Sequence, residues 1–279
     1  MSKQLSADEA LERVPELAGV QWRWEALSGG LTNRNFKVDT SDESFVLRLD
    51  SDHTAALGLD RELELSVRKN AHAAGLGAAV VYAEPGVLLS EYLPGNTWQE
   101  TDLRDDDKLA ALATLLRRVH ELPQAGKAFS AEATARQYSM TVTEGSGLRA
   151  FAEQCVAWLT AIPSSAVFSC CHNDIVAGNI VQHSDLKLLD WEYACDNDPL
   201  FDLASVIGFH DLDARQIDTL FNAYAGGADQ EMYENLQQHI RSFDIIQWLW
   251  FAARYCSSPD SITRARLKEL RSRIAASRP

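Results

Sequence analysis

Residues 172–190 carry polar side chains whose types and spacing suit chemistry with a hard cation. Asn179 follows Asp174 after four intervening residues, and Asp190 ends a strand-like stretch further along the chain. Magnesium prefers oxygen ligands and keeps several waters, so one amide oxygen and one carboxylate are enough protein ligands. A second carboxylate that stays unliganded could accept a proton from an attacking hydroxyl and orient it for in-line displacement. This division of roles is typical of phosphoryl transfer.

A β-hairpin must bring these side chains together. Residues 180–182 and 186–189 are strand-like and flank a turn of His, Ser and Asp. If Val181 pairs with Lys187 across that turn, the antiparallel hairpin places Asn179 beside Asp190. The loop that enters the hairpin carries Asp174, so we expect all three side chains to share one small volume.

Two other interpretations of this cluster stay open. His172, Asp174 and Asn179 could simply cap turns, since Asp and Asn favour such positions. His172 and Asp174 could also bind metal in a metallohydrolase, although the sequence has no H-E-x-x-H motif and no obvious further ligand cluster. The H-x-D-x4-N spacing, followed by an Asp at a strand end, is more specific than a lone H-x-D and favours the kinase interpretation.

The remaining elements predict an α+β protein with two lobes. Residues 1–93 are strand-rich, with an antiparallel sheet and one helix over residues 59–74, where apolar side chains recur every three or four positions. Residues 94–279 are mainly helical, apart from a strand cluster between 167 and 191. A Leu-Pro-Gly-Asn sequence at 93–96 is the candidate hinge between the two lobes.

Composition and charge exclude several classes of function. The 279 residues hold 26 basic and 40 acidic side chains, and this net charge of −14 repels nucleic acid and anionic membranes. The sequence contains no apolar run long enough to span a bilayer and no export signal, so we expect a cytoplasmic protein. Five cysteines without a C-x-x-C pair predict neither a disulfide framework nor a thiolate zinc site.

The segments 172–179 and 188–194 resemble the choline/ethanolamine kinases and bacterial thiamine kinases of the aminoglycoside phosphotransferase superfamily. Residues 29–38 look like the phosphate-covering loop of that family, and residues 45–49 look like its nucleotide-contacting strand. The resemblance therefore spans most of the chain. It implies a protein-kinase-like two-lobed fold, with an ATP-binding lobe over residues 1–93 and a catalytic and acceptor-binding lobe over residues 94–279. It also implies ATP and Mg²⁺ as cofactors.

The resemblance assigns roles to the polar cluster. It makes Asp174 the catalytic base, and it makes Asn179 and Asp190 the magnesium ligands. Asp202 matches a family residue that supports the catalytic loop, and it could also be the N-cap of a helix that begins near Leu203.

The resemblance also assigns the ATP site. Arg48 takes the place of the basic group over the phosphates, where protein kinases have Lys, and a guanidinium can bridge phosphate oxygens in the same way. Glu64 is the expected partner of Arg48, with Glu62 as a competitor; an exposed pair of Glu64 with Arg68 is the alternative. The other expected nucleotide contacts come from the loop and the hinge: Gly29, Gly30, Asn33, Asn35, Glu91 and Leu93.

The acceptor is expected to be a small alcohol with a cationic group. Aromatic faces and acidic groups hold cations, and the candidates are Glu192, Tyr193, Trp248, Trp250 and Tyr255. The last three lie on a helix expected over residues 242–256. Trp248, Phe251 and Tyr255 would share one face of that helix, and a stripe of this kind is also typical of a core.

The acceptor itself is not fixed by the sequence. Residues 189–194 look closest to thiamine kinases, whereas residues 171–174 look closest to choline kinases. The open alternatives are an aminoglycoside or sugar phosphotransferase and a catalytically silent, metabolite-binding kinase fold. The sequence does not indicate an oligomeric state.

Overall fold

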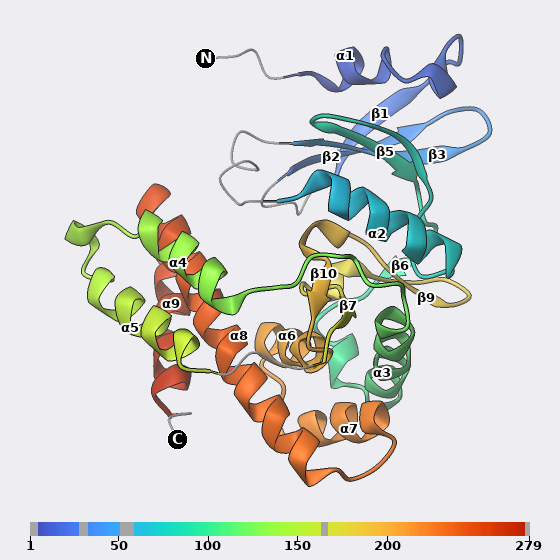
Figure 1. Cartoon of the computed structure of the whole chain (residues 1–279). Coiled ribbons are helices and arrows are strands. Elements are labelled where there is room, and N and C mark those ends of the chain that lie inside the picture. The colour runs from blue at the N-terminus through green and yellow to red at the C-terminus, as the bar shows by residue number, and fades with distance from the viewer. Residues whose placement is uncertain (1–4, 28–32, 51–58, 163–166, 277–279) are drawn as a thin grey trace. The chain divides into compact units, whose positions relative to one another are not determined.

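The computed structural model describes residues 5–27, 33–50, 59–162 and 167–276, which lie in two compact units (Figure 1). One unit comprises Met1–Gln99 with Ala177–Ala194, and the other comprises Glu100–Val176 with Cys195–Pro279. The hairpin after residue 176 thus packs with the N-terminal elements. The division into functional lobes at residue 94 stays a prediction.

The first unit is built on a five-stranded antiparallel sheet of order β1-β2-β3-β5-β4. Its strands are β1 (Arg23–Leu27), β2 (Asn33–Asp39), β3 (Ser44–Asp50), β4 (Val80–Glu84) and β5 (Val87–Glu91). The helices of this unit are α1 (Ala7–Leu11), the 3-10 helix η1 (Pro15–Leu17) and α2 (Arg61–Ala73). Ser6 and Glu9 form a capping box at the start of α1, and Asp60 caps α2.

The two faces of this sheet differ in character. Phe36, Leu47 and Leu89 are paired across three neighbouring strands and are buried against α1 and η1 in one apolar core. Side chains alternate along a strand, so the register places Asn35 beside Arg48 on the opposite face. Figure 1 shows α2 on that side of the sheet. One face of the sheet therefore packs in the apolar core, and the other carries the polar side chains of Asn35 and Arg48.

A small three-stranded sheet of order β6-β8-β9 completes the first unit. It consists of β6 (Asn96–Thr97), β8 (Ile180–Gln182) and β9 (Leu186–Leu188), preceded by η5 (Ala177–Asn179) and followed by η6 (Trp191–Tyr193). Val181 pairs with Lys187, which confirms the predicted hairpin register. Leu188 N–H also donates to Leu76 O, at 2.8 Å, and ties the hairpin to the segment after α2.

The second unit is helical apart from one pair of short strands, β7 (Ser169–Cys171) and β10 (Cys195–Asn197). Its α-helices are α3 (Asp106–His120), α4 (Ala131–Thr141), α5 (Arg149–Thr160), α6 (Leu200–His210), α7 (Ala214–Ala225), α8 (Gln230–Ser257) and α9 (Ser261–Ala276). Its 3-10 helices are η3 (Asp102–Arg104) and η4 (Glu144–Ser146). Across the described ranges, none of the helices combines the length and apolar character that crossing a membrane requires.

Candidate functional site

A buried ion pair between β3 and α2 forms the centre of the polar face. Arg48 Nη1 and Nη2 donate to Glu64 Oε1 and Oε2, at 2.5 and 2.8 Å. Both residues are buried, whereas Glu62 is exposed. The carboxylate that pairs with Arg48 is therefore Glu64. Two parallel N–H···O bonds fix both the distance and the orientation of the guanidinium.

Two further arginines of α2 also contact Glu64. Arg68 Nε donates to Oε1 at 2.7 Å, and Arg61 Nη1 donates to Oε2 at 2.7 Å. Burial opposes ionisation, yet the hydrogen bond from Arg48 and the charges of Arg68, Arg48 and Arg61 hold the pKa of Glu64 well below its usual range. The pair with Arg68 is thus part of a buried network rather than an exposed surface pair.

Arg61 is the residue of this network that the sequence did not reveal. Its Nε and Nη2 donate to the two oxygens of Asp50 on β3, at 3.1 and 2.8 Å. Its Nη1 donates to Glu192 Oε2 at 3.1 Å, and Asn33 Nδ2 donates to the same oxygen at 2.7 Å. The i, i+3 spacing from Arg61 to Glu64 was the available signal for its position beside the expected pair.

The hairpin holds Asn179 and Asp190 side by side, as the register predicts. Leu189 N–H donates to Asn179 O at 2.8 Å, and Asp190 follows in the left-handed region with φ of 58°. Non-glycine residues held in that region cluster at functional sites. Asp190 Oδ1 is a buried atom that accepts no hydrogen bond within the described residues, and it lies 3.8 Å from Arg48 Nη1.

This arrangement fits a magnesium ion. Asn179 and Asp190 offer an amide and a carboxylate, which are the oxygen donors that Mg²⁺ prefers. A buried carboxylate oxygen without a hydrogen bond is costly, and a bound cation would satisfy it.

Glu192 and Tyr193 lie in η6, directly after Asp190. Glu192 is buried and bonded to Asn33 and Arg61, while Tyr193 is half-buried. Burial and the neighbouring charge of Asp190 raise the pKa of Glu192 above its usual value. At least one oxygen of Glu192 is thus engaged within the arginine network.

The other expected nucleotide contacts lie along the same unit. Asn35 is half-buried beside Arg48, and Leu93 is buried in a small apolar cluster with Ala78 and Val181, against which Leu189 packs. Glu91 is exposed at the end of β5, and its backbone N–H donates to Ala79 O at 2.9 Å. Gly29 and Gly30 lie outside the described residues.

In the second unit, Asp202 supports the loop that carries Asp174. Its Oδ2 accepts the N–H of His172 at 2.9 Å, and its Oδ1 accepts the N–H of Asn173 at 2.6 Å. Asp202 is fully buried, whereas Asp174 is half-buried. The expectation that Asp202 caps a helix near Leu203 is wrong, because α6 already begins at Leu200 and Asp202 lies in its first turn.

His120 and Tyr224 extend this support. His120 Nε2 lies 3.1 Å from Asp202 Oδ2, and His120 Nδ1 lies 2.8 Å from the Tyr224 hydroxyl. Burial would raise the pKa of Asp202, but the bond to His120, with the charge of that histidine and the contacts of His172, lowers it below the usual value. Asp202 is therefore an ionised acceptor for the loop.

Asn173, the residue before Asp174, combines an unusual backbone conformation with side-chain hydrogen bonds to β10. Its φ of 65° lies in the left-handed region, which Asn tolerates better than most residues. Its side chain accepts from Asn197 Nδ2 at 2.7 Å and donates to Cys195 Sγ at 3.3 Å, both on β10. Backbone and side chain together fix the conformation of the loop at Asp174.

The expected aromatic residues of the acceptor pocket occupy different environments on α8. Trp248 is fully buried, packs edge-to-face on Phe151 at 4.7 Å, and donates its indole N–H to Leu267 O. It has no exposed surface with which to contact an acceptor. Trp250 and Tyr255 are half-buried. The guanidinium of Arg254 lies over the ring of Trp250, at 5.9 Å from its centroid.

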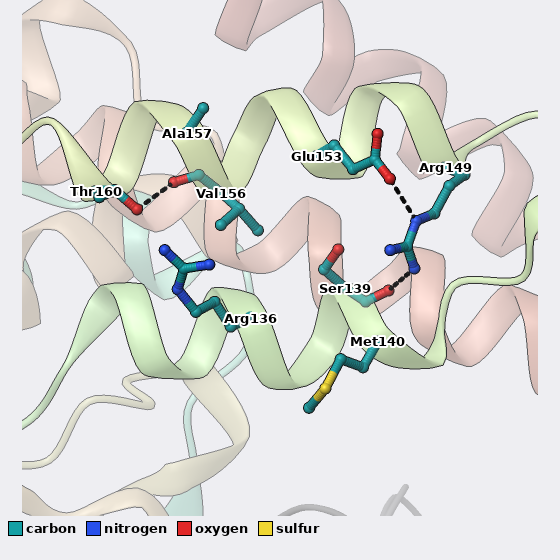
Figure 2. A pocket seen from close by; sticks show the side chains of 8 residues that line it. All are labelled: Arg136, Ser139, Met140, Arg149, Glu153, Val156, Ala157 and Thr160. Atoms are coloured by element: carbon teal, nitrogen blue, oxygen red, sulfur yellow. Dashed lines mark hydrogen bonds and ion pairs between the residues drawn. The ribbon is translucent and has the colours of Figure 1, made fainter.

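A surface groove of about 600 Å³ lies between α4 and α5 (Figure 2). Its lining includes Arg136, Met140 and Arg149, and none of the expected site residues. Both arginines are already bonded to carboxylates of their own helices, Glu132 and Glu153. The groove is therefore unrelated to the polar cluster.

The chain resembles known proteins in both sequence and fold. Residues 23–237 match the model of the phosphotransferase enzyme family. Protein LicA of Haemophilus influenzae is 30% identical over 240 residues, which cover 80% of this chain and 70% of that protein. Thiamine kinase of Escherichia coli is 28% identical over 274 residues, which cover 92% of this chain and 90% of that protein.

The fold has close counterparts among solved structures. A choline/ethanolamine kinase family protein from Mesorhizobium loti is 25% identical and superposes with a TM-score of 0.76. The match covers 97% of this chain and 93% of that chain. The predicted fold class, an antiparallel-sheet N-terminal part with a mainly helical C-terminal part, is confirmed.

Proposed function

Because this chain belongs to the phosphotransferase enzyme family and acts on an alcohol group, we propose that it uses ATP and Mg²⁺ to phosphorylate the hydroxyl of a small, cationic metabolite. Choline, ethanolamine and thiamine are the acceptors of this chemistry that the comparisons favour. Its relatives include proteins named thiamine kinase, and a structural neighbour is a choline/ethanolamine kinase family protein.

One observation carries the nucleotide and metal part of the proposal. Arg48 Nε and Asp190 Oδ1 are both buried polar atoms without a hydrogen-bond partner in the described part of the chain, beside an ion pair that already fixes Glu64. Buried polar groups in native proteins almost always have partners. An anion for Arg48 and a cation for Asp190 would satisfy both atoms, and Mg-ATP supplies the two together.

The residues of the first unit would then bind the nucleotide. Arg48 would donate to phosphate oxygens while Glu64 holds its orientation. Loop residues 29–36, with Gly29, Gly30, Asn33 and Asn35, would cover the phosphates with backbone N–H groups. The backbone at Glu91 and Leu93 would contact the adenine, and the apolar cluster around Leu93 offers a surface for its ring.

Asn179 and Asp190 would hold Mg²⁺. When bound, the ion would neutralise charge on the phosphates. The left-handed backbone at Asp190 and the Leu189–Asn179 hydrogen bond fix these two ligands before the ion arrives. Asn179 and Asp190 would therefore need little conformational change to bind the ion.

Asp174 would accept the proton of the acceptor hydroxyl and orient its oxygen for attack. Its place is set by Asp202, which holds the two preceding backbone N–H groups, and by the side chain of Asn173. Catalysis of this kind comes mainly from positioning and charge neutralisation.

The cationic part of the acceptor would contact aromatic side chains. We propose Tyr193, Trp250 and Tyr255, which are all half-buried, and we leave out Trp248 because its ring is fully enclosed by the helical core. Glu192 would contribute negative charge near Asp190, reduced by its bond to Arg61. The net charge of −14 favours a cationic acceptor over an anionic one.

The test is magnesium-dependent ADP release from ATP with choline, ethanolamine, thiamine, an aminoglycoside and simple sugars. The proposal predicts release stimulated by one of the three cationic metabolites. Stimulation only by an aminoglycoside or a sugar would replace the acceptor class. A metabolite that raises the melting temperature without any ADP release would instead identify a binding protein with a kinase fold.

A further inference from the structure

Arg61 connects three segments that are far apart in the sequence. One edge of its guanidinium binds Asp50 at the end of β3 through two nitrogens. The remaining nitrogen, Nη1, binds Glu64 of α2 and Glu192 of η6. The Arg61 side chain is about three-quarters buried, so these contacts are only partly screened by water.

The shared nitrogen brings two acidic side chains together. Glu64 Oε2 lies 2.7 Å and Glu192 Oε2 lies 3.1 Å from the same Arg61 Nη1. Two buried carboxylates that contact the same nitrogen atom would repel each other if the cation between them were removed. Arg61 therefore sets the distance between α2 and the turn that follows Asp190.

The ends of this bridge belong to the two halves of the proposed nucleotide site. Glu64 orients Arg48, the proposed phosphate ligand, and Glu192 lies two residues after Asp190, the proposed metal ligand. We propose that Arg61 is a positioning residue that locks the turn of residues 190–192 to the Arg48–Glu64 pair before any ligand binds. This inference rests on the proposed function. It means that the nucleotide site is already assembled before a ligand binds and does not need a movement of α2 to form.

The chemistry of the bridge requires arginine. Arg61 Nε and Nη2 donate to the two oxygens of Asp50, and this pair of bonds fixes the orientation of the guanidinium plane. In that orientation Nη1 donates to both Glu64 and Glu192. A lysine has one ammonium group on a flexible chain and cannot hold this planar arrangement. Arg61→Lys keeps the charge and should recover only part of the effect.

The experiment compares Arg61→Gln and Arg61→Lys with a matched control, Arg13→Gln, whose arginine is about half exposed and pairs with Glu84 on the surface. We expect Arg61→Gln to raise the KM for Mg-ATP at least tenfold, with a smaller rise for Arg61→Lys and none for the control. Backbone amides of residues 188–193 should exchange hydrogen faster in Arg61→Gln. In the double variant Arg61→Gln/Glu192→Gln, the KM for Mg-ATP should be lower than in Arg61→Gln alone, because one of the two repelling carboxylates becomes neutral.

A lower melting temperature with unchanged KM and unchanged exchange at residues 188–193 would overturn the proposal and leave Arg61 a purely structural residue. If Arg61→Gln does not fold, the KM and exchange of Arg61→Lys decide instead, and values equal to those of the wild type would overturn it. Hydrogen exchange needs no substrate, so it tests the positioning role of Arg61 even if no acceptor supports ADP release. The absence of ADP release with every acceptor would count against the proposed function alone.

Discussion

The two terminal nitrogens of Arg48 bond the two oxygens of Glu64, and the third nitrogen of that guanidinium has no hydrogen-bond partner in the described part of the chain. The carboxylate thus fixes the plane of the arginine and leaves Nε unsatisfied. Asp50 Oδ1 lies 3.8 Å from this nitrogen, which is too far for a hydrogen bond. A buried N–H without a hydrogen bond costs free energy, and the proposed phosphate ligand would relieve that cost.

Arg48→Lys should weaken nucleotide binding while the chain remains folded. An ammonium group keeps the charge that balances Glu64, but it cannot make two parallel bonds to a carboxylate and also reach a phosphate. We expect the KM for Mg-ATP to rise about 10- to 100-fold, which corresponds to roughly 1.4 to 2.7 kcal/mol. Steady-state kinetics at saturating acceptor measure this value, and an unchanged KM would remove Arg48 from the nucleotide site.

Glu64→Gln should change how stability depends on pH. The pKa of Glu64 is lowered in the folded protein, so the unfolded chain binds its proton more readily and the wild type loses stability as the pH falls below about 5. The variant lacks this titration, and its free energy of unfolding should fall less steeply with acid. Near neutral pH it should be less stable by about 3 kcal/mol. Urea unfolding at several pH values measures both effects, and parallel pH curves for the two proteins would contradict the account.

Asp202→Asn should slow turnover without weakening nucleotide binding. An amide cannot offer two acceptor oxygens to the N–H groups of His172 and Asn173, so the loop at Asp174 loses its support. We expect kcat to fall about 10- to 100-fold, since hydrogen bonds to charged groups contribute roughly 1.5 to 3 kcal/mol. Asp218→Asn is the matched control, because that exposed carboxylate accepts only a surface hydroxyl bond from Tyr233 among the contacts described. Equal kcat values in the two variants would refute the supporting role.

Gly95→Ala should destabilise the first unit. A Cβ at Gly95 would lie 2.6 Å from Gln182 O, and the residue has φ of 145°. Backbone cannot move aside easily, so we expect a loss of about 2 to 3 kcal/mol. Gly86→Ala is the control, because its Cβ would meet nothing within 4 Å and only its φ of 82° is strained, at about 1 kcal/mol. Thermal unfolding of both variants tests the difference, and equal losses would show that the contact with Gln182 is unimportant.

The hairpin was predictable from sequence because its signals are local. Strand-like residues on both sides of a short polar turn fix the pairing of Val181 with Lys187, and this pairing brings Asn179 to Asp190. Element ends were less predictable. The structure adds α1 at Ala7–Leu11 and the 3-10 helix η1 at Pro15–Leu17 to the one helix expected before residue 94, and Pro15 separates them because it disfavours the helical conformation of the residue before it.

The contacts of Arg61 were not predicted, because they join distant parts of the chain. Arg61 and Glu192 are 131 residues apart, and no local pattern pairs them. The start of α8 at Gln230 was missed because its first turns lack a strong apolar stripe, whereas the aromatic stretch from residue 242 is conspicuous. The same stripe could not show whether Trp248 faces a core or a pocket, since packing from α5 and α9 decides that.

The most direct test of the central claim compares wild-type protein with Asp174→Ala, using the acceptor that best stimulates ADP release. Two quantities are measured: formation of the phosphorylated acceptor and stabilisation by Mg-ATP. We predict that the variant loses product formation while Mg-ATP still raises its melting temperature, because the proposed nucleotide ligands are other residues of the chain. Near-normal product formation by Asp174→Ala would contradict the assignment of Asp174 as the base and, with it, the proposed mechanism.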